Sequence, residues 1–365
     1  MQYLRKGNLL KAPLHSRGLL LLALVGLTLI FSALAVFRHS FIATYSKPLR
    51  IVVAGDGRAE YPWNPPRVED TEGINKVITG EIAEAVLKEG AQILLWTGDF
   101  TNVSDNNPDT FRKQLHAWRD IIQPLYDHKV TVLPVRGNHE LYRYDKGSYE
   151  PIPILDARKA WNEVFSGEYE LPMNGPETEK NLSFYYIHDA VLCVGLDQYE
   201  NPLGHLVNQL WLEQVLKEHR KPFVFVYGHE PAFMSGTHDV NETLGAKPVA
   251  RNALWESLIR AGARVYLCGH DHLYDHMTVA RKIGDPEAVI HQLTAGTAGA
   301  PFYHGRTYKD NDSAWTLNNR QHIENTYGYV LIVLEKNKAT ITFKGRISPG
   351  QYEPMDSFSY TAAVP

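Results

Sequence analysis

Five short polar motifs divide this chain, and each directly follows an apolar run long enough to form a buried strand. In chain order, the motifs are AGDGR, TGDFTN, GNHE, YGHEP and CGHDH. The runs before them are rich in Val, Ile, Leu and Tyr, which is typical of strands covered on both faces. Because α/β enzymes keep their functional residues in loops at the ends of such strands, the pattern predicts an α/β fold with one site built from five loops.

Amphipathic helices are expected between the apolar runs. The segment from Ile74 to Glu89 carries apolar side chains at helical spacing, and a second helix is predicted from about Thr110 to Gln123. Two more are predicted, over HLVNQLWLEQVLKEH and from Ala250 to Arg260. This alternation predicts β-α-β connections, with helices packed on the faces of the sheets.

The rest of the body supplies an insertion and late strands. Residues 141–180 are rich in Tyr, Pro and Gly, so we expect an insertion at the rim of the site, with a helix around Ala157 to Val164. YGYVLIVLE and ATITFKG, joined at Lys336-Asn337-Lys338, predict a hairpin on a second sheet. No linker or repeat interrupts residues 48–345, so we expect one domain there, followed by a C-terminal tail over residues 346–365.

The N-terminal segment has the pattern of a membrane anchor. Residues 1–50 contain no Asp or Glu, and basic residues precede the uncharged run GLLLLALVGLTLIFSALAVF, which extends from Gly18 to Phe37. About twenty apolar residues in a helix span a bilayer. We therefore expect residues 18–37 to be a transmembrane helix, with the basic residues 1–17 on the cytoplasmic side and the body exported.

A cleaved signal peptide is the alternative for the same segment. Ala33-Leu34-Ala35 has the small-x-small form of a processing site that follows an apolar core. We favour the retained anchor because the apolar run continues past that site. The anchor places a single-pass protein in the cell membrane, whereas cleavage would give a secreted or periplasmic protein.

Charge and cysteine content exclude other classes. Removal of residues 1–47 leaves 31 basic and 41 acidic residues, so the body is acidic, and an extended nucleic acid is not an expected ligand. The two cysteines, Cys193 and Cys268, both lie in apolar strand-like runs. A disulfide-rich scaffold is therefore excluded, and we expect both thiols to pack as small core residues.

The residue types in the motifs suit the hydrolysis of phosphate esters by two metal ions. That reaction needs a hydroxide at neutral pH and neutralisation of the phosphate oxygens, and two ions about 4 Å apart provide both. Carboxylate, amide and imidazole ligands favour Mn, Fe, Zn or Ni over the ions that thiolates select. The motifs contain this mixture of acids, amide and histidines without a thiolate ligand.

All five motifs have counterparts in the calcineurin-like metallophosphoesterases, the superfamily that includes the purple acid phosphatases, and the chain resembles this family from about Leu49 to Gly345. The resemblance implies a four-layer αββα sandwich of two mixed sheets flanked by helices, with two divalent or trivalent ions. For the first metal the implied ligands are Asp56, the bridging Asp99 and His272. For the second metal they are Asp99, Asn138, His229 and His270. His139 would contact the phosphate and protonate the leaving group.

Position 58 departs from the family pattern. The first motif of the family usually reads Asp-x-His with the histidine on the first metal, but this chain has Arg58. Purple acid phosphatases instead use a tyrosine three residues after the bridging aspartate, where this chain has Asn102. Water or Asn102 would then complete the first site. Arg58 either holds a phosphate oxygen or pairs with an acid on a neighbouring loop.

Several polar residues near the motifs match no ligand position. Glu140 and Asp271 are expected to support the ligands or to face solvent. His238, Tyr199 and His304 are candidates for substrate contact, with a surface role as the preferred interpretation for each.

The sequence therefore predicts a metallophosphoesterase that attacks a phosphate mono- or diester with a metal-bridging hydroxide. The substrate would be a small molecule or a lipid-linked phosphate, and the N-terminal helix would contact the membrane. The alternative is a degenerate domain that keeps one metal and serves as a non-catalytic binding module.

Overall fold

The computed structural model describes residues 48–61, 64, 70–71, 73–105, 107–146, 150–200, 204–284, 288–305 and 312–362. The predicted cytoplasmic segment 1–17 and transmembrane segment 18–37 lie outside these residues. No helix in the described ranges is long and apolar enough to cross a membrane. The chain separates into two units, Met1–Thr44 and Tyr45–Pro365, and the fold below belongs to the second.

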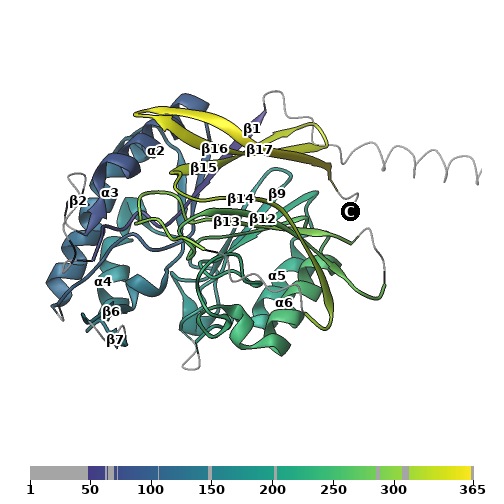
Figure 1. Ribbon diagram of the computed structural model, residues 1–365, viewed down its shortest axis with the longest axis horizontal. Helices are drawn as coiled ribbons and strands as arrows, with labels where there is room; N and C mark the ends of the chain where they lie inside the picture. The colour runs from purple at the N-terminus through teal and green to yellow at the C-terminus, as the bar shows by residue number, and fades with distance from the viewer. Residues whose placement is uncertain are drawn as a thin grey trace, which may run out of the picture. The chain divides into compact units, whose positions relative to one another are not determined.

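A six-stranded mixed sheet carries the first three motifs (Figure 1). In spatial order its strands are β17 (Gln351–Thr361), β16 (Lys338–Ser348), β15 (Gly328–Glu335), β1 (Leu49–Ala54), β4 (Ile93–Trp96) and β5 (Thr131–Pro134). Strands β1, β4 and β5 are parallel, so their carboxyl ends meet at one edge of the sheet. The pairs from β1 to β17 are antiparallel.

A seven-stranded mixed sheet carries the last two motifs. In spatial order its strands are β14 (Trp315–Ile323), β12 (Tyr274–Arg281), β13 (Ile290–Ala295), β11 (Val265–Cys268), β10 (Phe223–Tyr227), β9 (Val191–Gly195) and β8 (Phe184–His188). Its four central strands, β13, β11, β10 and β9, are parallel. Two small ribbons pair β2 (Asp70–Thr71) with β3 (Ile74–Asn75), and β6 (Tyr142–Tyr144) with β7 (Pro151–Pro153).

The helices form close to where the sequence predicts them. They are α2 (Lys76–Glu89), α3 (Pro108–Asp127), α4 (Ala157–Val164), α5 (Gln209–Glu218) and α6 (Pro248–Arg260), with single 3₁₀ turns η1 (Asn138–Glu140), η2 (Gly167–Tyr169), η3 (Glu177–Glu179), η4 (Val240–Glu242) and η5 (Leu244–Ala246). The side chain of Asn75 caps α2, and Gly90 ends it in a left-handed conformation. Asn107 and Asn208 cap α3 and α5 in the same way.

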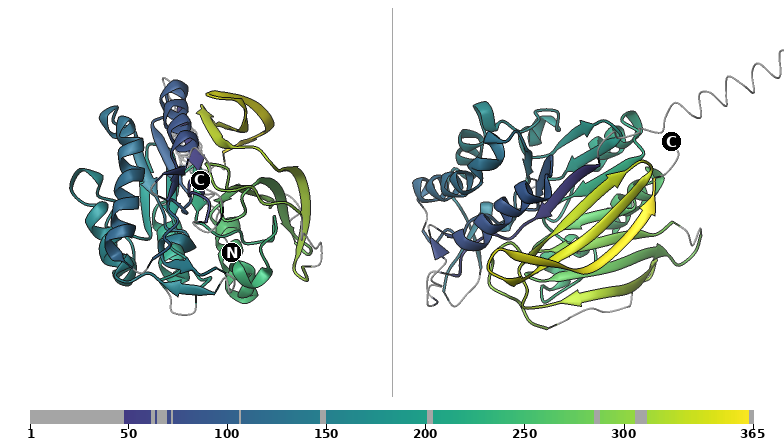
Figure 2. Two further views of the ribbon diagram at one scale, coloured as in Figure 1. Left: turned by 60° about the vertical axis from the view of Figure 1, so that its left-hand side comes forward. Right: turned by 90° about the horizontal axis from the view of Figure 1, so that it is seen from above.

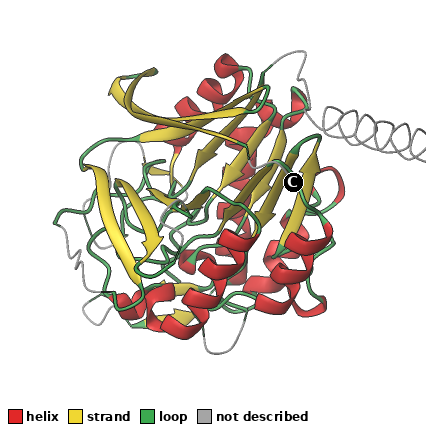
Figure 3. Ribbon diagram, turned by 90° about the vertical axis from the view of Figure 1, so that its right-hand side faces the viewer, coloured by secondary structure: helices red, strands yellow, loops and turns green. Residues whose placement is uncertain are grey.

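Helices cover the outer face of each sheet, and the inner faces pack together. The colours of Figure 2 place α2 and α3 against the six-stranded sheet, and Figure 3 shows the strands between layers of helix. Residues of α5 and α6, such as Leu212 and Trp255, pack in one core with strands of the seven-stranded sheet. Across the sheets, the rings of Tyr274 and Phe343 stack at 4.0 Å. The predicted α/β class with mixed sheets is confirmed.

The buried thiols behave as core residues. Cys193 and Cys268 are both free and buried, so the expectation that they pack as small core residues is confirmed. Burial raises the pKa of the Cys193 thiol to about 12, and a thiol that stays protonated is a poor nucleophile.

Two expectations about the C-terminal part of the chain are wrong. The hairpin of β15 and β16 extends the first sheet, not a second one, because β15 pairs antiparallel with β1. Residues 351–361 are also not a tail but strand β17, which pairs with β16 along its length. Both errors concern the pairing of strands that are far apart in sequence. In addition, the edge strand QYEPMDSFSYT has polar side chains on one face and little apolar periodicity, so its sequence does not indicate a strand.

The aromatic cluster between β4 and α3 should dominate the stability of the first layer. Trp118 is fully buried, and its ring meets those of Trp96 and Phe100 at 5.1 and 4.5 Å. Trp118→Ala should lower the free energy of unfolding by about 3–5 kcal/mol because it leaves a large cavity. Leu210→Ala, at a side chain that is 81% exposed, is the control and should change it by less than about 0.5 kcal/mol. Urea unfolding measures both, and equal effects would contradict this account of the core.

Candidate metal centre

The five motif loops meet where the two sets of parallel strands end. Asp56 follows β1, Asp99 follows β4 and Asn138 begins η1 after β5. His229 follows β10, and both His270 and His272 follow β11. The structure thus brings all six sequence-predicted ligands to one place, although they come from two different sheets.

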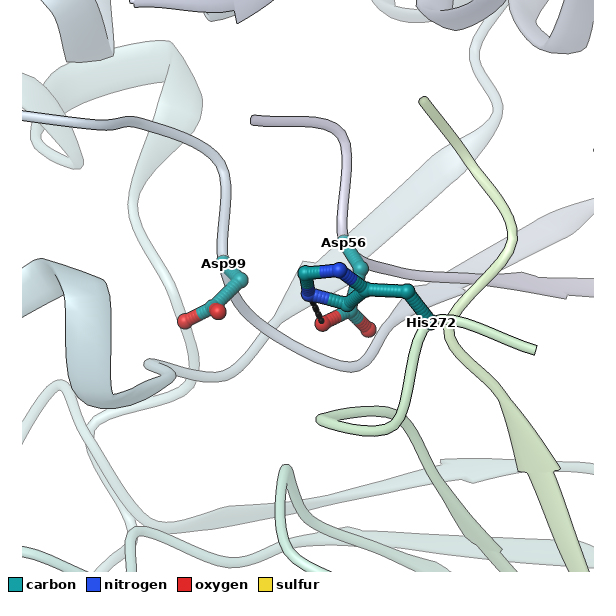
Figure 4. A group of neighbouring side chains, drawn as sticks. All are labelled: Asp56, Asp99 and His272. Atoms are coloured by element: carbon teal, nitrogen blue, oxygen red, sulfur yellow. Dashed lines mark ion pairs between the residues drawn. The ribbon is translucent and has the colours of Figure 1, made fainter. Parts of the chain in front are cut away.

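The first group of side chains contains Asp56, Asp99 and His272 (Figure 4). One ligand atom of each lies within 4.8 Å of the others, and all three residues are buried. His272 Nε2 lies 3.6 Å from Asp56 Oδ1. Two carboxylate oxygens and an imidazole nitrogen at these separations are suited to a divalent or trivalent cation.

The second group shares Asp99 with the first. His229 Nε2 lies 3.4 Å from Asp99 Oδ1, 2.9 Å from Asn138 Oδ1 and 3.1 Å from His270 Nδ1. His270 Nδ1 lies 3.1 Å from the same amide oxygen. His229 Nε2, His270 Nδ1 and Asn138 Oδ1 thus lie within 3.1 Å of one another, with Asp99 Oδ1 beside His229, and this arrangement fits a second cation with Asp99 between the two groups.

Hydrogen bonds behind the ligands orient their lone pairs inward. His229 Nδ1 lies 2.7 Å from the carbonyl oxygen of Thr97, and His272 Nδ1 lies 2.7 Å from that of Pro301. A carbonyl only accepts, so each Nδ1 carries the proton and each Nε2 is free to bind a metal. The amide nitrogen of Asn138 donates to the Tyr144 hydroxyl at 2.7 Å, which turns its oxygen toward the histidines.

The backbone at the ligands is held in an uncommon conformation. Asp56, Asp99 and His270 have φ values of 60°, 54° and 72°, in the left-handed region that non-glycine residues seldom adopt. Such conformations persist only where surrounding contacts impose them, and they concentrate at functional sites. Here the Asp56 carboxylate accepts the backbone N–H of His270, and the Asp99 carboxylate accepts that of His139.

The buried carboxylates of the centre are unfavourable unless a positive charge compensates them. Asp56 and Asp99 are 0% and 1% exposed. Burial and the neighbouring Asp99 charge raise the pKa of Asp56 well above its ordinary value. Two adjacent buried carboxylates are costly unless cations compensate them, so the donor set and its charge both fit metal ions.

Glu140 supports the loop that carries Asp99. It is completely buried and accepts the backbone N–H groups of Asp99, Phe100 and Gly137 at 2.8, 2.9 and 2.8 Å. Burial, followed by the Asp99 charge, raises its pKa to about 8. Of the two roles left open for Glu140, support of the ligands is the one that the structure shows.

Arg58 lies beneath the site and makes contacts within the protein. It is 0% exposed, donates to the Ala59 carbonyl and the Tyr303 hydroxyl, and places Nε 3.9 Å from Asp99 Oδ2. Its guanidinium also lies over the Tyr61 ring at 4.8 Å. These contacts favour the pair with a neighbouring acid over direct contact with phosphate.

Asn102 is tied to the loop that carries Arg58. Its amide nitrogen donates to the carbonyl oxygens of Ala59 and Glu60, at 3.3 and 3.0 Å. Asn102, at the position where purple acid phosphatases have a tyrosine, thus fixes the loop that follows the first motif.

His139 is buried beside the second group. Its Nε2 lies 3.9 Å from Asp99 Oδ2, and its ring contacts those of Tyr61 and Tyr144. Burial, followed by the charge of Arg58, lowers its pKa to about 3. His139 is therefore neutral at pH 7 and suits a hydrogen-bond donor to phosphate better than a proton donor.

His238 has the opposite electrostatic environment. Its Nδ1 lies 2.8 Å from Asp271 Oδ1, and its ring stacks on His270 with centroids 3.8 Å apart. Burial acts to lower the pKa of His238, but the hydrogen bond and charge of Asp271 outweigh it and raise the pKa above its ordinary value. Asp271 is thus a buried support for His238 and not a solvated residue.

A cavity of about 730 Å³ opens above both groups. Of the predicted ligands, Asp99, Asn138, His270 and His272 line it, together with His139. His238 and Tyr199 also line it, so the surface role preferred for them from sequence was wrong, whereas His304 remains exposed. No local pattern could have revealed His238, because its partner Asp271 lies 33 residues further along the chain.

The fold and this site define a two-sheet α/β protein with a candidate dinuclear metal centre. The family model described as "Calcineurin-like phosphoesterase" matches residues 49–274, more than half of the chain. The chain belongs to the calcineurin-like phosphoesterase family, and the matched domain is a hydrolase of phosphoric esters.

Curated relatives and solved structures agree with this assignment. Tartrate-resistant acid phosphatase type 5 of Homo sapiens is 28% identical over 249 residues, which cover 65% of this chain and 70% of that protein. The purple acid phosphatase PPD1 of yellow lupin matches with a TM-score of 0.60 at 16% identity, over 87% of this chain and about half, 54%, of the lupin chain. A dimetal phosphatase from Danio rerio matches with a TM-score of 0.51 at 12% identity, over 86% and 99% of the two chains. The two structural matches show the fold.

Gly269 leaves room for the Asp56 carboxylate. A Cβ at position 269 would overlap that carboxylate and lie 3.0 Å from Thr97 Oγ1. Gly269→Ala should therefore displace Asp56 and lower metal affinity at least about tenfold. Gly80→Ala, where the nearest atom to the new Cβ is 3.9 Å away, is the matched control and should leave metal binding unchanged. Calorimetric titration with Mn²⁺ or Zn²⁺ measures both, and wild-type affinity in Gly269→Ala would contradict this placement of Asp56.

Asp271 should set the pH range in which His238 is charged. Asp271→Asn removes the charge that raises the pKa of His238, so that pKa should fall. If the imidazolium supplies a proton, activity is lost as pH rises through this pKa, and the variant should lose activity at lower pH than the wild type. Rate–pH profiles measure the shift, with the exposed Asp120→Asn as the control. An unchanged alkaline limb would contradict the role of Asp271.

Proposed function

We propose that this protein hydrolyses phosphate mono- or diesters with two metal ions held by the candidate centre. One observation carries the proposal: two ligand groups share Asp99 beneath a cavity large enough for a small substrate. Family membership supports the same reaction class.

The proposed metal ligands are the six residues of the two groups. Asp56, Asp99 and His272 hold the first ion, and Asp99, Asn138, His229 and His270 hold the second. When bound, two divalent or trivalent ions, of Mn, Fe, Zn or Ni, neutralise the phosphate oxygens and make hydroxide available at neutral pH. Arg58 adds a fixed positive charge beside Asp99, and this charge lowers the affinity of the first site for its ion.

Two histidines of the chain then supply the hydrogen bond and the proton that the reaction also needs. His139, neutral and at the cavity wall, donates a hydrogen bond to a phosphate oxygen. His238, whose pKa Asp271 raises, gives its proton to the leaving alcohol. Both imidazoles are held by packing against rings or ligands, so little reorganisation is needed during the reaction.

A non-catalytic binding module with one metal is the second candidate. Arg58, in place of the family's histidine, is the observation that favours it. If this candidate holds, the protein binds one ion and turns over no ester, whereas Arg58→His should increase the number of bound ions.

The proposal includes the location of the protein, which decides the phosphate esters that it can reach. The apolar run Gly18 to Phe37 supports a membrane anchor that leaves the catalytic body outside the cell, and a cleaved signal would release the same body. Either location gives access to small phosphate esters. The anchor also brings lipid-linked phosphates within reach.

Hydrolysis of 4-nitrophenyl phosphate and bis(4-nitrophenyl) phosphate by residues 46–365 tests the proposal. Metal-stripped protein should be inactive and should regain activity with Mn²⁺, Fe²⁺ or Zn²⁺. Asp99→Asn should lower kcat by more than about 100-fold, the upper end for residues that only support ligands. His139→Ala should lower kcat by about 10²–10³-fold, as for loss of one donor to the transition state.

Matched controls separate chemistry from folding. Asp120→Asn and His188→Ala change the same residue types outside the cavity and should retain wild-type rates. Folded, metal-loaded protein that turns over neither ester would contradict the proposal and favour the binding module.

A further inference from the structure

The cavity above the metal centre combines aromatic rings with carboxylates. Its lining includes six aromatic residues, Tyr61, Tyr142, Tyr144, Tyr199, Phe302 and Tyr303. Three acidic residues that take no part in the metal groups also line it, namely Glu60, Glu230 and Glu242. Among the described residues that line this cavity there is no Lys or Arg, and its basic side chains include His205 and His238, whose pKa values hydrogen bonds to Glu230 and Asp271 raise although burial opposes this. A phosphate group needs no such surroundings, so these side chains are available to contact the alcohol part of a substrate.

Glu230 is the most constrained of the three acids. It is 1% exposed, and its Oε1 lies 2.9 Å from His205 Nδ1. Its Oε2 makes no hydrogen bond of good geometry, although the hydroxyl of Tyr199, which lines the same cavity, interacts with this carboxylate. A buried carboxylate oxygen that is this weakly satisfied is costly, and its position on the cavity wall allows a ligand to supply a further donor.

The position of Glu230 in the chain places it next to the reaction centre. It directly follows the metal-ligand candidate His229, so the two Cα atoms are about 3.8 Å apart. Glu230 and the ligand candidates Asn138 and His270 line the same cavity. A substrate whose phosphate lies at the metal groups therefore shares this cavity with the Glu230 carboxylate.

Two further carboxylates and the tyrosine rings reinforce this preference. Glu242 is exposed in η4, and its charge contributes to the raised pKa of His238. Glu60 follows the first motif at the cavity rim. The ring of Tyr61 already makes one cation–π contact, because the Arg58 guanidinium lies 4.8 Å from its centroid. Carboxylates together with aromatic faces attract a cation and repel a second anion.

We propose that the preferred substrates are phosphate monoesters of short amino alcohols, whose ammonium group binds at Glu230 with support from Glu242. This inference rests on the proposed phosphoesterase function and names its substrate class. Water adds to phosphorus and the P–O ester bond breaks. The leaving oxygen takes a proton, and the products are inorganic phosphate and the amino alcohol. Monoesters with a second anionic group, such as 2-phosphoglycolate, are poor substrates.

A pair of nearly isosteric substrates tests the charge preference directly. Aminoethyl phosphate and propyl phosphate differ in one terminal group, an ammonium in the first and a methyl in the second. With the metal-loaded protein, kcat/KM for aminoethyl phosphate should exceed that for propyl phosphate by about tenfold or more, as for one charged contact in a shielded site. 2-Phosphoglycolate should fall below both.

Variants of the acids connect this ratio to the proposed contact. Glu230→Gln should bring the ratio of aminoethyl to propyl phosphate toward one, and Glu242→Gln should lower it by a smaller factor. Glu242→Gln also serves if Glu230→Gln does not fold, because Glu242 is exposed. Glu335→Gln, at an exposed glutamate that does not line the cavity, is the control and should keep the wild-type ratio.

The outcomes separate this inference from the proposed function. Hydrolysis of 4-nitrophenyl phosphate with an aminoethyl-to-propyl ratio of one or less overturns the inference alone. A high ratio that survives in both Glu230→Gln and Glu242→Gln also overturns it. No hydrolysis of any monoester by folded, metal-loaded protein overturns the phosphoesterase function, and this inference with it.

Discussion

The site depends on the burial of one carboxylate, that of Asp99, between two groups of ligands. Its charge has almost no contact with water, so it must be compensated from within the protein and by bound cations. His229, His139 and Arg58 all lie close to it, and with the backbone N–H of His139 they keep its pKa below the ordinary value although burial opposes this. Glu140 holds the backbone on both sides of it. Much of the surrounding polar network therefore compensates the buried charge of Asp99.

The fold explains how such a network can form. Parallel strands bring their carboxyl ends to one edge, and the two sheets pack so that both of these edges meet. The ligands occupy left-handed backbone positions at these strand ends, where a regular strand would direct the side chains elsewhere. Small residues such as Gly269 allow the loops to approach closely. Precise placement of the ligands therefore comes from rigid sheets, while the strain is confined to short loops.

Two histidines of the cavity illustrate how the environment of a side chain sets its protonation. His139 and His238 are the same residue type and lie in the same cavity. His139 faces Arg58 and has a lowered pKa, whereas His238 faces Asp271 and has a raised one. Groups with pKa values pushed apart can serve different roles at one pH. The acids of the cavity also differ in environment, since Glu230 is buried beside His205 whereas Glu242 is exposed.

The sequence by itself determined the strand-end motifs and the alternation of helix and strand, because these depend on local patterns and on order along the chain. Helix α4 formed at the predicted residues for the same reason. The six residues that gather at the site were implied by the resemblance of those motifs to the calcineurin-like family. Tertiary structure alone decided that β15 to β17 extend the first sheet, that Arg58 is buried against Asp99, and that His238 rests on Asp271. These features rest on contacts between residues far apart in sequence, and their free energy depends on burial and charge that no local pattern records.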